Sequence, residues 1–279
     1  MPSRKTRIRV APVLVQIGAT LLVVTYAIPY VYLLLTSLKP PGDVLQIPPS
    51  FLPSRIALDN YQSLFATPSI PLAFVNSLVV AVVSTLLALM LAVPAAYGAS
   101  FLRARLSNWF LIFALVTRMV PAVSLGIPLF VMLKSVGLLD TQLGLILAHT
   151  TQSLPLAIWL MAAFFESVPQ ELEEAARIDG ASRFGAFVMI ILPVVSGGIA
   201  VAALFSFIAS WNEFLYALLL TAERAKTAPI VIAQFKTAYG LDWGPMTALA
   251  TLYSLPIIVV TLLLQKHIIG GLTLGAVKG

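Results

Sequence analysis

The sequence contains no cysteine, so disulfide bonds, thiolate metal sites and thiol nucleophiles are excluded. Charge is also scarce. Asp, Glu, Lys and Arg make up 10% of the 279 residues, and 59% of the chain is hydrophobic, whereas soluble proteins carry about 25% charged residues. A soluble core has no room for so many apolar side chains. The composition therefore predicts a protein whose apolar side chains face lipid.

Motifs for nucleotide, metal and hydrolytic chemistry are missing as well. No G-x-x-x-x-G-K-[ST] is present, so we expect this chain to bind neither ATP nor Mg²⁺. His149 and His267 are isolated, and no G-x-S-x-G occurs, so we expect no metal site, no cofactor and no catalytic residue. The net charge of +6 comes from cations at the ends of apolar runs, which argues against nucleic-acid binding.

What the sequence does contain is a series of long apolar runs. About 20 apolar residues cross the roughly 30 Å hydrocarbon core of a bilayer as a helix. We therefore predict an all-α, polytopic membrane protein with six transmembrane helices. The predicted runs are 10–38, 72–101, 109–133, 143–165, 187–220 and 246–265.

The cations set the predicted orientation. Arg4, Lys5, Arg7 and Arg9 precede the first run, and Lys and Arg concentrate on the cytoplasmic side of membrane proteins. With six spans, both termini are then cytoplasmic. The Pro-rich connector 39–71 becomes an external loop.

One polar stretch, residues 167–193, interrupts the apolar runs and is predicted to be cytoplasmic. Ser167 and Gln170 have the spacing of a capping box, which predicts that a helix starts there. Gly180 after Asp179 predicts that this helix ends in a left-handed turn. Ser182 is then placed to cap a second helix. The stretch therefore predicts a helix–turn–helix that faces water.

The first of these helices carries glutamates and a narrow face of small residues, including Ala175 and Ala176. Helices that lie on lipid usually have Lys and Arg opposite bulky apolar side chains. This composition favours docking into a groove of another protein. The alternative is an amphipathic helix on the lipid surface.

The same stretch closely resembles the EAA motif of ABC importer permeases, EAA-x3-G-x9-I-x-L-P. It reads Glu174-Ala175-Ala176, Gly180, Ile190 and Leu192-Pro193, with every spacing kept. The segments NYQSLF, FVNSLVVA, RMVPAV, WNEF and GLTLGAVKG also resemble carbohydrate-type permeases related to the smaller membrane subunit of the maltose importer. The likeness covers nearly the whole chain.

The resemblance implies one transmembrane domain, 1–279, of the type I ABC importer permease fold, with a coupling loop at about 167–187. In that family the loop seats in a separate ATPase subunit, which binds ATP and Mg²⁺. The residues that the resemblance assigns to coupling are Glu174, Ala175, Ala176, Asp179, Gly180, Ala181 and Ser182.

The resemblance also implies the partners: a second homologous permease subunit, two ATP-binding subunits and an extracytoplasmic substrate-binding protein. The implied location is the bacterial inner membrane, surrounded by lipid. The expected cargo is a sugar, a di- or oligosaccharide, although polyols and glycerol phosphate diesters are carried by similar permeases. The outer segment 221–244 would meet the binding protein, or it is simply a connector.

Polar residues in the spans are candidates for a translocation path or gate. Arg118 and Glu213 are the costly ones, because an ionisable group at membrane depth costs about 2.5–3.5 kcal/mol on insertion scales. They either form an ion pair between helices or line the path. For the other polar residues the alternative is hydrogen bonding between helices. The candidates are Asn76, Arg118, Gln152, Trp211, Asn212, Glu213 and Tyr216.

A function of a different class is a self-contained channel or secondary transporter for a small polar solute. Such proteins often consist of paired internal repeats with interrupted helices. The two halves of this chain show no convincing repeat. This reading also leaves the polar helix–turn–helix unexplained.

Overall fold

The computed structural model describes residues 10–101, 107–234 and 243–274, which are helices joined by turns, without a strand in these ranges. The amino-terminal cations at 4–9 and the loop residues 235–242 lie outside the described residues. The chain divides into two compact units. The first comprises 1–67 and 235–253, and the second comprises 68–234 and 254–279. Each unit is described by itself below.

The first unit contains α1 (Val10–Ser37), α2 (Pro41–Val44), α3 (Asp59–Ala66) and the beginning of α14 (Trp243–Leu274). The connector after α1 therefore includes two short helices. The buried Asn60 on α3 donates its side-chain amide to the carbonyls of Ser37, at 2.9 Å, and Lys39, at 3.0 Å. The hydroxyls of Ser37 and Tyr61 lie 2.7 Å apart. These bonds fix α3 to the end of α1.

The second unit contains most of the helices and the remainder of α14. Its helices are α4 (Ser69–Phe101), α5 (Ser107–Thr117), α6 (Ala122–Ser135), α7 (Gln142–Glu166), α8 (Glu171–Ile178), α9 (Arg183–Ala186), the π-helix η1 (Phe187–Ile191), α10 (Leu192–Val194), α11 (Ser196–Trp211), α12 (Leu215–Leu220) and α13 (Ala228–Gln234).

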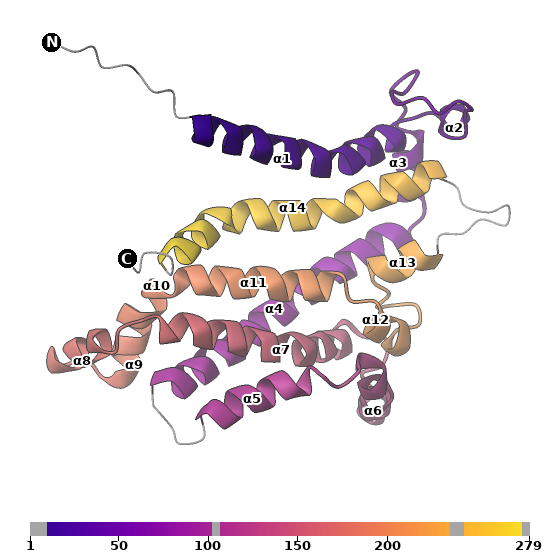
Figure 1. Cartoon of the computed structure of the whole chain (residues 1–279). Coiled ribbons are helices and arrows are strands. Elements are labelled where there is room, and N and C mark those ends of the chain that lie inside the picture. The colour runs from indigo at the N-terminus through magenta and orange to yellow at the C-terminus, as the bar shows by residue number, and fades with distance from the viewer. Residues whose placement is uncertain (1–9, 102–106, 235–242, 275–279) are drawn as a thin grey trace, which may run out of the picture. The chain divides into compact units, whose positions relative to one another are not determined.

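The core of this unit lies where α4, α7 and α11 pack against one another (Figure 1). Alanines on α4 line this contact, and Ala81, Ala88 and Ala92 are fully buried. Gly198 on α11 lies so close to Phe164 of α7 that a Cβ atom would overlap the ring. Small residues allow helix backbones to approach closely, which is how membrane helices gain van der Waals contact.

Four helices are long and apolar enough to cross a membrane, and the described residues supply up to six spans if each of two bent pairs counts as one. The all-α, polytopic fold is thus confirmed. The predicted continuous run 109–133 is wrong in detail, because α5 and α6 meet at 90° across residues 118–121. Pro121 cannot continue a helix from Val120, since proline disfavours the α conformation in the residue before it. The run that begins at 187 also bends, by 73°, just after Pro193.

Candidate functional site

The polar stretch forms the predicted helix–turn–helix. α8 ends at Ile178, and Gly180 follows with φ of +94°, a left-handed conformation that favours glycine. The hydroxyl of Ser182 accepts a hydrogen bond from the backbone N–H of Gly185 at 3.0 Å, so Ser182 caps α9 as predicted. We call α8, the turn and α9 the polar hairpin.

The predicted capping box at the start of α8 is wrong. The hydroxyl of Ser167 donates to the carbonyl of Phe164, at 2.7 Å, and therefore closes the end of α7. Gln170 stands at the cap position of α8, without a side-chain cap bond. Val168 and Pro169 thus form a connection between α7 and α8 that the capping-box spacing did not indicate.

Most residues assigned to coupling lie on the surface of the polar hairpin. Ala176 and Ala181 are half-buried, and the exposed ones are Glu174, Ala175, Asp179, Gly180 and Ser182. Two large apolar side chains beside them are also exposed, Ile178 at 85% and Phe184 at 75%. The sequence analysis did not single these two out, although both flank the turn. In the described hairpin they are the side chains best suited to fill an apolar groove of a partner.

Glu213 lies at the joint between α11 and α12, and its carboxylate caps α12. The carboxylate oxygens accept hydrogen bonds from the backbone N–H groups of Tyr216, at 2.9 Å, and Ala217, at 3.1 Å. Negative charge at a helix amino end is favourable, because the free N–H groups there point toward it. Glu213 is thus part of the framework that joins α11 to α12.

The partner of Glu213 is His149 on α7, with 3.4 Å between Nε2 and Oε2. Nδ1 of His149 lies 2.7 Å from the Ser210 hydroxyl, which in turn accepts from Ser84 at 3.0 Å. All four side chains are buried. One polar chain therefore links α4, α7, α11 and the α12 joint.

The predicted alternative of an Arg118–Glu213 ion pair is wrong. Arg118 is exposed in the break between α5 and α6, and Glu213 pairs with His149 instead. The sequence held a usable indication, since His149 stands inside an apolar run and an ionisable group at membrane depth needs a partner. The isolation of His149 in the sequence was used only as an argument against a metal site.

Asn76 on α4 holds the segment that follows α12. Its side-chain amide donates to the carbonyls of Arg224, at 3.0 Å, and Lys226, at 2.9 Å, and its oxygen accepts from Gln142 at 2.8 Å. Beside it, the buried Ser77 hydroxyl accepts from the N–H of Ala228 at 2.8 Å. Asn76 is 2% exposed. Its hydrogen-bonding groups are occupied by the protein.

Asp140, in the turn before α7, holds the same segment from another side. Its carboxylate accepts hydrogen bonds from four consecutive backbone N–H groups, residues 222–225, at 2.9–3.1 Å. Burial raises the pKa of Asp140, but these four N–H groups outweigh it and hold the pKa at about 2. The residue has φ of +55°, which aspartate tolerates better than most residues. Sequence analysis missed this anchor.

The remaining path candidates divide into buried and accessible residues. Trp211 is 1% exposed and stacks on Phe207 with ring centroids 5.9 Å apart, and Tyr216 lies in the apolar core. Asn212 is exposed at the end of α11, and Gln152 is half-buried on α7. The structure places Trp211, Asn212, Glu213 and Tyr216 at one joint.

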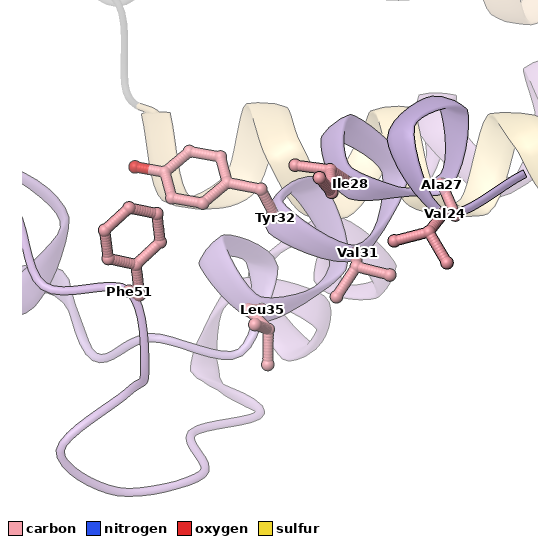
Figure 2. A pocket seen from close by; sticks show the side chains of 7 residues that line it. All are labelled: Val24, Ala27, Ile28, Val31, Tyr32, Leu35 and Phe51. Carbon is pink, nitrogen blue, oxygen red and sulfur yellow. The ribbon is translucent and has the colours of Figure 1, made fainter. Parts of the chain in front are cut away.

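The first unit has an apolar pocket of about 300 Å³ against α1 (Figure 2). Six of its lining residues come from α1, and Phe51 of the following loop stands edge-on to Tyr32, with ring centroids 6.0 Å apart. Almost all lining atoms are carbon. Such a surface suits hydrocarbon and lacks the donors and acceptors that sugar hydroxyls require.

Comparison with known proteins agrees with this architecture. The family model described as "Binding-protein-dependent transport system inner membrane component" matches residues 84–273. The trehalose transport system permease protein SugB of Mycobacterium tuberculosis is 39% identical over 92% of this chain and 95% of its own length. The trehalose/maltose transport system permease protein MalG of Thermococcus litoralis is 34% identical over 96% and 97%.

A similar fold occurs in the crystal structure of a bacterial ABC transporter involved in the import of the polysaccharide alginate. The TM-score is 0.77, with 23% identity, covering 95% of this chain and 99% of the other. The predicted resemblance to ABC importer permeases is confirmed by these matches. The chain belongs to the family of binding-protein-dependent transport system inner membrane components.

Proposed function

We propose that this chain is the permease subunit of an ATP-driven sugar importer in the bacterial inner membrane. In this proposal the whole chain, 1–279, acts as one membrane domain with both termini in the cytoplasm. It pairs with a second, similar permease, two ATP-binding subunits and an external substrate-binding protein. Support for sugar comes from the relatives, whose names specify trehalose and maltose. A di- or oligosaccharide is the expected cargo.

The observation that carries the proposal is the polar hairpin. A short exposed helix, a glycine in the left-handed conformation and a capped second helix lead directly into the bent span at Pro193. A partner ATPase, which would bind ATP and Mg²⁺, would bind the exposed surface of the polar hairpin. The proposed contact residues are Glu174, Ala175, Ala176, Asp179, Gly180, Ala181 and Ser182.

Among the path candidates, Asn212 is the better proposal for a sugar contact, because it is exposed and carries a planar amide group. Gln152 is half-buried, and its side-chain oxygen is buried without a hydrogen-bond partner, so it comes second. Asn76 and Glu213 are committed to hydrogen bonds within the protein. Trp211 and Tyr216 are buried. For Asn76, Glu213, Trp211 and Tyr216, a role in contacts between helices is therefore favoured over a place in the translocation path.

The test uses the complete importer, reconstituted in liposomes with its ATPase, its second permease and its binding protein. Uptake of labelled trehalose and ATP hydrolysis are measured together. We expect Gly180→Val to keep hydrolysis while uptake falls about tenfold or more, because valine cannot easily hold φ of +94°. The altered turn would change the orientation of the polar hairpin.

The matched control is Gly137→Val. Gly137 also has positive φ, +71°, and open space around the position of a Cβ atom, as Gly180 does. The two variants carry similar backbone strain, but Gly137 lies in the turn after α6. Equal loss of coupling in both variants would overturn the proposed role of the hairpin. Trehalose uptake by this chain alone, in liposomes without ATP, would favour the channel or secondary transporter.

A further inference from the structure

One residue of the segment 221–228, between α12 and α13, has both of its backbone groups held by side chains. The N–H of Arg224 donates to the two carboxylate oxygens of Asp140, at 3.1 and 3.0 Å. The carbonyl of Arg224 accepts from the side-chain amide of Asn76, at 3.0 Å. Asp140 precedes α7 and Asn76 lies on α4, so anchors from two parts of the unit fix the backbone of Arg224.

The backbone on either side of Arg224 is fixed as well. The N–H groups of residues 222, 223 and 225 donate to the same carboxylate of Asp140, at 2.9–3.1 Å. The N–H of Asp140 in turn donates to the carbonyl of Leu220, at 2.9 Å. At the other end of the segment, the N–H of Ala228 donates to the hydroxyl of Ser77, at 2.8 Å. Hydrogen bonds therefore hold the backbone along the whole segment.

The side chain of Arg224, by contrast, is exposed, whereas the next residue, Ala225, is 1% exposed. The ion pairs found among the described residues do not include Arg224. Its neighbour Glu223 pairs with Lys226, at 3.0 Å. The segment therefore presents a guanidinium group, on a fixed backbone, to whatever lies outside this chain.

The segment lies at the opposite end of its unit from the polar hairpin (Figure 1). α7 begins two residues after Asp140 and ends at Glu166, shortly before α8. Its 25 residues span about 37 Å at 1.5 Å per residue, more than the roughly 30 Å of a hydrocarbon core. If the hairpin faces the cytoplasm, as proposed above, Arg224 faces the outside.

An exposed arginine on a fixed backbone is well suited to bind a carboxylate of another protein. A guanidinium can donate two parallel hydrogen bonds to one carboxylate, and arginine is enriched among the residues that dominate the energy of protein interfaces. Association normally costs free energy because surface groups lose freedom. At Arg224 the hydrogen bonds to Asp140 and Asn76 have already ordered the backbone, so binding restricts the side chain alone.

We propose that Arg224 docks the external substrate-binding protein by pairing with an acidic side chain of that protein, and that Asp140 and Asn76 are positioning residues for this contact. The inference rests on the proposed importer function, which supplies the binding protein as the partner on the outer side. The description of the family as binding-protein-dependent supports that choice of partner. Charge complementarity specifies the surface of the partner, which carries carboxylates where it meets Arg224.

The test measures ATP hydrolysis by the complete importer in liposomes, with trehalose, while the concentration of the binding protein is varied. We expect Arg224→Ala to raise the half-saturating concentration of binding protein about tenfold and to keep the maximal rate. Arg224→Glu should raise it further, because two carboxylates then face each other. Added salt should weaken docking of the wild type more than docking of Arg224→Ala, since salt screens the ion pair that the variant lacks.

The matched control is Lys134→Ala. Lys134 is an exposed cation in the last turn of α6, which packs against α12, so this variant removes the same charge at the same end of the unit. It should leave the half-saturating concentration unchanged. Equal rises in Lys134→Ala and Arg224→Ala would show that only the general charge of this surface matters, and would overturn the inference.

Hydrogen exchange of the amides 222–225 separates a lost contact from a loosened segment. Exchange should stay unchanged in Arg224→Ala, because the bonds to Asp140 and Asn76 involve the backbone of residue 224. Asp140→Asn should speed up exchange and also raise the half-saturating concentration, by about threefold, although the arginine is still present. A loosened segment with normal docking would contradict the positioning role of Asp140.

The same titration distinguishes this inference from the importer proposal. If Arg224→Ala and Arg224→Glu dock as the wild type does, the inference is wrong, and the importer proposal stands as long as the binding protein stimulates hydrolysis by the wild type. If the binding protein has no effect on the wild-type complex, the importer proposal fails and this inference fails with it.

Discussion

His149 and Glu213 form a buried pair that joins two helices remote in sequence, with 3.4 Å between Nε2 and Oε2. Each residue of this pair also makes a second contact. Glu213 also caps α12, and His149 also bonds Ser210, so the contact orients the short helix after the break. Because α12 leads into the segment that Asp140 and Asn76 hold, the pair belongs to one connected frame.

Glu213→Ala should destabilise the protein strongly, by about 3 kcal/mol, because it leaves His149 and two helix-end N–H groups without an acceptor. The melting temperature of the purified protein in detergent measures the effect. His149→Ala should cost a similar amount, and the double variant should cost less than the sum of the two. His267→Ala, at an exposed position of α14, is the control. Additive losses would show that the pair is not a unit.

Asp140→Asn should loosen the segment 221–228. An asparagine side chain presents one acceptor and one donor group to four N–H donors, so at least one N–H loses its partner, at a cost of about 1–3 kcal/mol. Hydrogen exchange of the amides 222–225 should become faster. Asp59→Asn, at an exposed aspartate, should leave that exchange unchanged.

The contribution of Asp140 should depend on pH in the acid range. Its pKa is lowered from 3.8 to about 2, so the folded protein favours the charged form. The stabilisation is fully present above pH 4 and is lost as the pH falls toward 2. The difference in melting temperature between the wild type and Asp140→Asn should therefore shrink over that interval. A difference that stays constant down to pH 2.5 would contradict this assignment.

Asn76→Ala should destabilise by about 1–3 kcal/mol, because the carbonyls of Arg224 and Lys226 lose a buried donor. Asn108→Ala, at an exposed position of α5, should stay within about 0.5 kcal/mol. Both are measured by thermal unfolding. If Asn76 instead serves mainly as a sugar contact, the variant would lose uptake and keep its melting temperature.

Ser182→Ala should weaken the start of α9, because the N–H of Gly185 loses its acceptor, at about 1 kcal/mol. Exchange of the Gly185 amide should rise about fivefold. Ser167→Ala should not change that exchange, since the Ser167 hydroxyl bonds the end of α7. If Ser167→Ala instead weakened the start of α8, Ser167 would act as the cap that its spacing from Gln170 predicts.

Features with local causes were predicted well from the sequence. The four long spans begin and end within a few residues of the predicted apolar runs, apart from the longer end of α14. Gly180 and Ser182 were placed correctly, because a positive φ and a helix cap depend on residues two or three positions away. The break at 118–121 was missed, although Arg118 and Pro121 stand inside that run.

The partners of polar residues were not predictable in the same way. Glu213 was recognised as costly, and an ion pair with Arg118 was one of two alternatives for it, whereas its partner in the structure is His149. Asp140 and Asn76 bind backbone groups more than 80 and more than 140 positions away. Spacing says nothing about such contacts, because they depend on how α4, α7 and α11 pack.

The sequence by itself determined that this chain spans a membrane and exposes a helix–turn–helix with the EAA pattern, since hydropathy and turn chemistry act locally. Only the tertiary structure decided which polar groups pair and which candidates are buried. The reason is physical. An unpaired polar group in an apolar surrounding takes whichever partner the packing brings near, and packing is a property of the whole fold.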